Sequence, residues 1–312
     1  QTRIASNIDP ITRAAGIPNL KEERSLNFSS GFVIKVLEGL NLTLDGYAIK
    51  IRNRLVLSGM FSAQDATLSS SFTDKLKSLD VASAQFFGNA VNTTNLGLDF
   101  VISYNKKWNK DALAISFNGN FNKVYIDAIN IPGSLNDSYI HQKSFFSDRE
   151  EQFLKASAPA SKMVFSIEYK TRKWKIGIRE VYFGKLQTLG FGWTGLASKI
   201  GTNGPGDPAI SGSFRGIDPY VDLDGYNDQI HVTPEIFTYN PKITTDIYGS
   251  LNLSKVLSWS FGIDNLFNVH PDYAVVPGAR RESFVNETGG SWESVQMGFN
   301  GIRFYNKLRL SF

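Results

Sequence analysis

The sequence predicts an all-β fold, an antiparallel β-barrel that crosses a membrane, and three observations lead to this prediction. Apolar and polar residues alternate in many segments, as in strands with one apolar and one polar face. No uninterrupted run of about 18 apolar residues could form a membrane helix. Short and long connections take turns between the predicted strands, which is typical of barrels with short periplasmic turns and long extracellular loops.

The last eleven residues show the alternation most clearly. One face of this strand would contact lipid, and the other, cationic face would line a polar lumen. The apolar face carries Ile302, Phe304, Leu308, Leu310 and Phe312, and the cationic face carries Arg303, Lys307 and Arg309.

The same pattern assigns about nine strands, and their connections predict which end of each strand is extracellular. The predicted strands are residues 26–36, 40–58, 84–108, 113–122, 163–169, 174–178, 243–253, 259–264 and 302–312. If the last strand ends in the periplasm, the long loops are extracellular. Because single-chain bacterial barrels have an even number of strands, nine strands cannot form a whole barrel. Either one strand is missing from this assignment, or the chain begins partway round the barrel.

The connections read as polar and irregular. We predict loops over residues 1–24 and 189–234, a polar segment over 61–83, and a short helix near residues 150–158. Three asparagines, Asn118, Asn120 and Asn122, share one face of the fourth strand. Dry burial of three amides would be unfavourable, which predicts that this face is wet.

Composition excludes several classes of protein. The 33 Lys and Arg exceed the 29 Asp and Glu, giving a net charge of +4, yet no basic run or stripe indicates nucleic-acid binding. The excess suits anionic headgroups or a polar lumen. Without cysteine the chain has neither a disulfide nor a thiolate metal site. It begins without a signal peptide, so we expect a mature product or an excised piece.

Four motifs resemble those of TonB-dependent outer-membrane receptors. The segment 262–268 is similar to the penultimate-strand "NLF" element, and the last strand ends on Phe312, as is typical of the family. Residues 17–25 resemble the entry to a mid-barrel strand, although the usual proline after Lys21 is missing. Residues 86–99 resemble a strand common in these receptors, in Bacteroidetes-like members in particular.

The resemblance implies that residues 1–312 are the C-terminal part of a 22-stranded receptor barrel in the outer membrane of a Gram-negative bacterium. The plug domain and the N-terminal barrel strands would be absent. The implied partners are outer-membrane lipid, TonB acting through the plug, the barrel-assembly machinery that reads Phe312, and a nutrient, most often a ferric siderophore or similar chelate. Neither a cofactor nor an enzymatic activity is expected.

Candidate metal sites lie in or beside the long loops. The three histidines, His141, His231 and His270, could coordinate haem or a metal, but their spacing is that of solvated loop residues. A cluster of four aspartates resembles part of a calcium loop, although Tyr220 and His231 stand where its first and twelfth ligands belong. The four candidates are Asp218, Asp222, Asp224 and Asp228.

Candidate ligand residues in the same loops are aromatic or cationic. The aromatic candidates are Phe191, Trp193, Phe214, Tyr220, Tyr226 and Trp292. They would form either a ligand platform or an interfacial girdle. Arg280 and Arg281 could bind an anionic siderophore or form surface ion pairs.

Two other classes of function stay open at this point. A soluble β-rich adhesin or binding module would bury the phenylalanines of the first, fourth and last strands in a dry core. An outer-membrane barrel enzyme would need a nucleophile and a base within hydrogen-bond reach, and the sequence contains no recognisable nucleophile motif.

Overall fold

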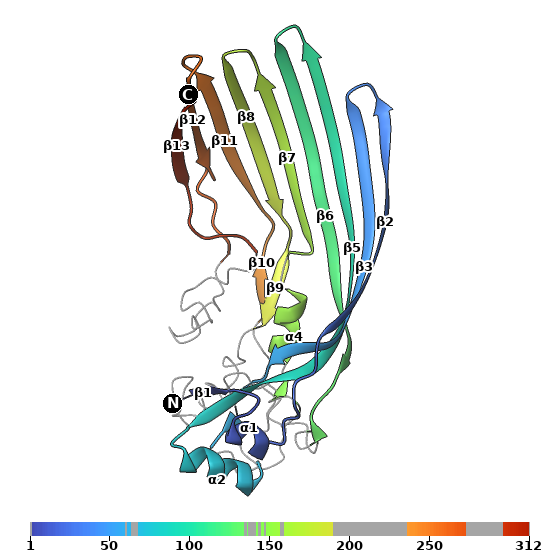
Figure 1. The fold of residues 1–312 in the computed structure, drawn as a ribbon, viewed down its shortest axis with the longest axis vertical. Helices are drawn as coiled ribbons and strands as arrows, with labels where there is room; N and C mark the ends of the chain where they lie inside the picture. The colour runs from blue at the N-terminus through green and yellow to red at the C-terminus, as the bar shows by residue number, and fades with distance from the viewer. Residues whose placement is uncertain are drawn as a thin grey trace.

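The wall of the molecule is one long antiparallel sheet (Figure 1). The computed structural model describes residues 2–59, 61–63, 68–133, 136, 142, 145–146, 148–156, 159–189, 236–272 and 296–311. The wall strands, in their hydrogen-bonded order, are β2 (Arg24–Leu37), β3 (Leu40–Leu57), β5 (Ser83–Trp108), β6 (Asp111–Ile129), β7 (Ser161–Lys170), β8 (Trp174–Phe183), β11 (Lys242–Asn252), β12 (Leu257–Asp264) and β13 (Arg303–Leu310). These strands confirm the predicted set and its antiparallel pairing.

The register gives the wall one apolar and one polar face. Directly opposite residues of neighbouring strands project to the same side of a sheet. One such row joins Leu44, Phe100 and Gly119, and another joins Ile263 to Phe304. The apolar face continues from Phe28 and Phe32 on β2 to Leu308 and Leu310 on β13, with Asn306 as a polar exception on the last strand.

This apolar face is not a dry core. Phe28 is 68% exposed, Phe304 is 69% exposed and Phe121 is 42% exposed. A soluble module would have buried these side chains, so the structure contradicts that alternative. Exposed apolar side chains spread over a whole sheet face require a nonaqueous surrounding, as lipid provides.

The short turns lie together at one end of the wall, at the top of Figure 1, and the long connections lie at the other. Gly39 turns between β2 and β3 at φ 83°, and a Cβ there would lie 2.2 Å from the carbonyl oxygen of Asn105. Near this end the rings of Trp108 and Trp174 lie 5.9 and 5.4 Å from that of Tyr169. Such aromatic groups mark a membrane interface.

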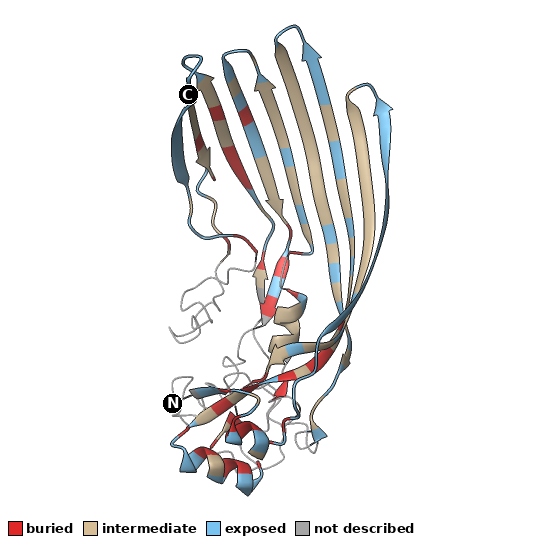
Figure 2. Ribbon diagram, in the orientation of Figure 1, coloured by how far each residue is buried: buried red, intermediate tan, exposed pale blue. Residues whose placement is uncertain are grey.

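The long-connection end contains a small hydrophobic core, which we call the outer cluster. Four elements build it around the start of β5: β1 (Thr2–Ala5), α1 (Pro10–Ala14), β4 (Phe61–Ser62) and α2 (Ser70–Ser78). The rings of Phe61, Phe72 and Phe86 lie 5.8 to 6.2 Å apart, and each residue is at most 1% exposed. Figure 2 shows buried residues gathered here, with others on β8 and β11, whereas β2, β3 and β6 contain none.

The outer cluster corrects the prediction that residues 1–24 and 61–83 are irregular. Strand β1 pairs in parallel with β5, and the carboxylate of Asp9 caps α1 by accepting a hydrogen bond from the backbone N–H of Ile11. These elements are too short to show a clear period in the sequence. Their apolar residues are buried by packing against one another, not by a long strand pattern.

The remaining elements lie between the outer cluster and the wall (Figure 1). Helix α4 (Asp148–Lys155) confirms the predicted helix and begins two residues earlier. Strands β9 (Leu186–Leu189) and β10 (Ile236–Tyr239) pair as a separate two-stranded ribbon. None of the helices in the part of the chain that the structure describes is long and apolar enough to cross a membrane.

Candidate functional site

Within the described residues, the polar face of the wall carries most of the hydroxyl, amide and charged side chains of the sheet. Asn118, Asn120 and Asn122 lie on this face, as predicted. The amide of Asn120 donates hydrogen bonds to Asp99 and to the hydroxyl of Tyr47, which links three strands. Hydroxyl, amide and charged groups therefore line the side of the wall that would face the barrel lumen.

An ion-paired row crosses four strands of this face near the long-connection end. Arg179 on β8 donates hydrogen bonds of 2.8 and 2.6 Å to Asp246 on β11 and lies 3.9 Å from Asp264 on β12. Arg303 on β13 donates hydrogen bonds of 2.9 and 2.5 Å to the same Asp264. Two arginines thus flank two carboxylates, and the row carries no net charge.

The "NLF" segment holds the outer end of this row. Asn265 adopts a left-handed conformation, with φ 52°, and its side chain closes a turn by accepting from the N–H of Val269 and donating to its carbonyl. Its backbone N–H donates to Asp246 at 2.8 Å. Asn268, also left-handed, accepts from the N–H of Ile302. The two asparagines therefore join β12 to β11 and to the start of β13.

A cavity of about 450 Å³, here called the rim cavity, opens on the polar face at this point. Its charged lining residues are Lys162, Arg179, Asp246 and Asp264, with Asn265 beside them. Apolar groups, including those of Phe183 and Met297, complete the lining of the cavity. Because the Nζ of Lys162 lies 5.0 Å above the Phe183 ring, the cavity combines an aromatic surface with a cation that has no carboxylate partner among the described residues.

Two side chains, those of Gln296 and Asp272, hold together the segments around the rim cavity. The side-chain amide of Gln296, only 3% exposed, donates to the carbonyl oxygens of Gly184 and Asn240 at 3.0 and 2.8 Å. Asp272 accepts from Lys242 and from the backbone N–H of Asn240. Burial opposes ionisation of Asp272, but these hydrogen bonds and the lysine charge outweigh it and lower its pKa.

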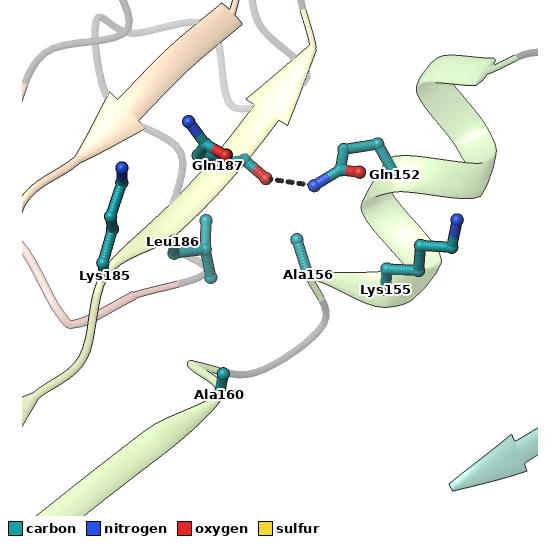
Figure 3. A pocket seen from close by; sticks show the side chains of 7 residues that line it. All are labelled: Gln152, Lys155, Ala156, Ala160, Lys185, Leu186 and Gln187. Carbon is teal, nitrogen blue, oxygen red and sulfur yellow. Dashed lines mark hydrogen bonds between the residues drawn. The ribbon is translucent and has the colours of Figure 1, made fainter. Parts of the chain in front are cut away.

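A second cavity, of about 270 Å³, lies between α4 and β9 (Figure 3). We call it the helix cavity. Gln152 donates a hydrogen bond of 2.8 Å to the carbonyl of Gln187 across it, and Lys155 and Lys185 stand at its edges. Lys155 is paired with Glu151, one helical turn earlier. The cavity is thus polar and mildly basic.

Nearly all the site residues predicted from sequence lie outside the described residues. These are the calcium candidates Asp218, Asp222, Asp224 and Asp228, the ligand candidates Phe191, Trp193, Phe214, Tyr220, Tyr226, Arg280, Arg281 and Trp292, the histidines His141 and His231, and Phe312. His270 is described and is half-buried. Within the residues that the structure places, no group of three or more His, Cys, Asp or Glu side chains could hold a metal.

Four charged residues of the rim cavity were not predicted from the sequence as site residues: Lys162, Arg179, Asp246 and Asp264. The sequence does contain an indication of their position, because each of them alternates with the lipid-facing apolar residues of its own strand and so belongs to the opposite face. The assembly of Arg179, Asp246 and Asp264 with Arg303 into one row depends on the register between strands that are far apart in the sequence. Only the pairing of β8, β11, β12 and β13 supplies that register.

Comparison with solved structures supports the barrel fold. The outer-membrane transporter YddB from Escherichia coli matches with a TM-score of 0.52 and 10% identity, over 94% of this chain and 33% of that one. A ferric enterobactin receptor (PfeA) mutant from Pseudomonas aeruginosa matches with a TM-score of 0.50 and 15% identity, over 94% and 32%. This chain thus spans about a third of the length of the structures it matches. No curated protein sequence matches.

A family model described as "TonB dependent receptor-like, beta-barrel" matches residues 3–266, which is most of the chain. The match includes eight of the wall strands and the first part of the "NLF" segment. The family comprises transporters of the Gram-negative outer membrane, not enzymes. The strand pattern, the two-faced wall and the family model agree, and the chain belongs to the TonB-dependent receptor β-barrel family.

Proposed function

We propose that residues 1–312 form the C-terminal part of a TonB-energised outer-membrane transporter with about 22 barrel strands. In this proposal the plug domain and the earlier strands belong to the rest of the protein. Support comes from the family match and from the wall, which has the two faces of a barrel segment but spans about a third of the related structures. Membership of a Bacteroidetes-like branch is part of the proposal and rests on residues 86–99.

We propose an anionic nutrient complex, most simply a ferric siderophore or a similar chelate, as the transported substrate. The observation that carries this proposal is the excess of cations on the polar face. Its cations are Lys35, Lys107, Lys162, Lys170, Lys175, Arg179, Lys242, Arg303, Lys307 and Arg309, and its carboxylates are Asp45, Asp99, Glu168, Asp246 and Asp264. A lumen with one predominant sign of charge attracts ligands of the opposite sign.

The arrangement suggests successive roles for the wall. Most of the carboxylates are already engaged: Glu168 pairs with Lys175, and Asp246 and Asp264 pair with the two arginines. Lys162, Lys307 and Arg309 have no ion pair with any described residue, so they are available to a passing anion. Ligand would first meet the extracellular loops, including the candidates Trp193, Tyr226 and Arg280, and would then pass the rim cavity.

The remaining steps belong to partners. TonB would pull on the plug domain from the periplasm, and the wall needs no catalytic group for this. The barrel-assembly machinery would read Phe312 at the end of the last strand. We predict that Phe312→Lys lowers the surface level of the complete receptor; normal surface levels of this variant would refute the role of Phe312.

The test of substrate class is uptake by cells that express the complete natural chain containing residues 1–312. Iron-55 complexes of a catecholate and of a hydroxamate siderophore are supplied to cells with and without TonB. We expect TonB-dependent accumulation of at least one complex. Accumulation that is equal in both strains would contradict TonB-energised transport. Absence of accumulation for every ferric chelate supplied would contradict the proposed substrate class.

The cationic face is tested in the same assay. The triple variant Lys162→Gln, Lys307→Gln, Arg309→Gln should lower uptake by about tenfold at low salt, because the attraction of the anion is reduced. The matched control removes three cations of the outer cluster surface, Arg13, Lys75 and Lys77, and should leave uptake within about twofold.

A further inference from the structure

A group of cations stands on the lipid side of the wall, just beyond the apolar band. The apolar face of β3 ends at Ala48, and the next outward positions are Lys50 and Arg52. On β6 the outward face ends at Phe121 and continues with Lys123. All three cations lie on the long-connection side of the band, where the extracellular leaflet would end.

The strand register brings these cations into neighbouring rows. Leu96 on β5 is opposite both Ala48 and Lys123, and the next outward residue, Thr94, is opposite both Lys50 and Tyr125. Lys123 leans towards that second row, since its Nζ lies 5.0 Å from the centre of the Tyr125 ring. Lys50 and Lys123 therefore belong to one outward patch across three strands.

Arg52 extends the patch by one more row, where it is opposite Arg24 on β2. Like charges directly opposite one another are unfavourable unless an anion lies between them. Lys50, Arg52 and Lys123 are exposed and have no ion pair with any described residue. Arg24 lies 3.9 Å from Glu22, with both side chains more than three-quarters exposed, so this pair is weak.

Acidic groups near the patch offset only part of its charge. Asp127 lies on the same face further from the band and accepts a hydrogen bond of 2.6 Å from Thr94. Glu23 accepts from the backbone N–H of Leu55. With Arg24 the patch has four cations against three nearby carboxylates, those of Glu22, Glu23 and Asp127, so it keeps a net positive charge at the level of lipid headgroups. Tyr125, an aromatic residue that is 40% exposed, lies among these cations.

At the same level on the other half of the wall, the lipid-facing residues carry a different charge. On β8 the outward position beyond Ile178 is Glu180, which accepts a hydrogen bond of 2.8 Å from Thr245 on β11. No cation stands there among the described outward positions of β7, β8 and β11. Among the residues that the structure describes, the positive patch is therefore confined to β2, β3, β5 and β6.

We propose that Lys50, Arg52 and Lys123 form a binding site for the phosphate groups of a phosphorylated glycolipid in the extracellular leaflet. The acyl chains of this lipid would lie against the apolar residues below, such as Phe121 and Leu98, while its phosphates contact the cations. Each cation close to anionic headgroups adds to the attraction, and guanidinium and ammonium groups both bind phosphate. The site would hold one lipid at a fixed place on the wall.

Binding of fluorescent lipid A by the complete natural chain in detergent micelles tests the proposal. The probes are bisphosphorylated lipid A, the same lipid without its phosphates, and inorganic phosphate as a competitor. The triple variant Lys50→Gln, Arg52→Gln, Lys123→Gln should bind bisphosphorylated lipid A about tenfold or more weakly than the wild type. The control variant Arg13→Gln, Lys75→Gln, Lys77→Gln should bind it as the wild type does.

The comparison between probes identifies the ligand. We expect the wild type to prefer the phosphorylated lipid and millimolar inorganic phosphate to displace it only weakly. Equal binding of the dephosphorylated lipid, equal binding by the triple variant, or complete displacement by phosphate would each overturn the proposal. The heat-dependent shift of the folded barrel on electrophoresis shows whether each variant is folded. If the triple variant does not fold, the single variants Lys50→Gln and Lys123→Gln are measured in its place.

Discussion

The wall and the outer cluster bury their apolar side chains in opposite ways. Phe86, in the outer cluster, is fully buried against other rings of the same chain, whereas Phe304, on the wall, is 69% exposed. Both residues belong to strands of one sheet. The difference shows that the medium around each part, water at one end and lipid along the wall, decides which side of a strand is apolar.

Strand β5 contains the transition within one element. Near its start, Phe86 and Ala90 face the outer cluster and are fully buried, while further along Leu98 and Ile102 are each 38% exposed on the lipid side. A register shift between Asn92 and Thr93 separates the two parts. The extra residue at this shift lies on β6, so the four residues keep the same even positions along β5. The bulge bends and twists this strand pair, and one strand thereby passes from a protein core to a membrane surface.

Removing a ring from the outer cluster should give the largest effect. Phe86→Ala deletes a fully buried ring and should destabilise the cluster by about 3–5 kcal/mol, because a cavity remains between Phe61 and Phe72. Hydrogen exchange should accelerate in α1 and α2. The neighbouring Phe87, 44% exposed, is the matched control, and an equal effect of Phe87→Ala would contradict the existence of a distinct outer core.

A charge on the lipid face should have the next largest effect. Phe117 lies near the middle of the apolar face of β6, and Phe117→Lys should lower the free energy of unfolding from lipid vesicles by about 2–4 kcal/mol. Asn118, the next residue, lies on the polar face, so Asn118→Lys should change it by less than about 1 kcal/mol. Denaturant titration of the complete chain in vesicles gives both values, and a reversed order would mean that the faces are misassigned.

The ion-paired row of the polar face should have a smaller effect. Asp246→Asn weakens the contacts with Arg179, whose side chain is 45% exposed, and we expect a loss of about 1 kcal/mol in unfolding free energy. A double-mutant cycle with Arg179→Gln isolates the pair. A coupling energy indistinguishable from zero would show that this ion pair does not stabilise the wall.

The smallest expected effect is a pH dependence at the rim cavity. The pKa of Asp272 is lowered in the folded protein, so its contribution is present above the ordinary aspartate pKa of about 3.9 and is lost as pH falls through the lower folded value. The protection factor for hydrogen exchange near Asn240, which is corrected for the intrinsic exchange rate at each pH, should therefore fall below about pH 4. Lys242→Gln should reduce this acid sensitivity; an unchanged profile would show that the pair is not its cause.

The wall could be predicted from the sequence and the outer cluster could not, for a physical reason. Each wall strand is long enough to repeat its alternation several times, and the membrane imposes the same face on all of them. The elements α1, β4 and α2 are short, and what they bury is fixed only once they meet β5 in space. The segment 61–83, which was predicted to be irregular, therefore contains the ordered helix α2.

For the candidate site, the sequence predicts which face the charged residues occupy but not which of them contact one another. Alternation alone places Lys307 and Arg309 on the polar face, and this prediction is confirmed by the pairing of β13 with β12. The join between Arg179, Asp246 and Asn265 needs the three-dimensional register and the left-handed turn at Asn265. Sequence spacing contains neither.

The environment of successive residues on β6 in a bilayer is the decisive test of whether the wall has one lipid face and one lumenal face. The chain has no cysteine, so single cysteines at residues 113 to 122 can each carry one spin label. We predict a period of two, with labels at odd positions relaxed by lipid-dissolved oxygen and labels at even positions relaxed by a water-soluble nickel complex. Absence of this alternation, or nickel access at the odd positions, would contradict a wall with one lipid face and one lumenal face.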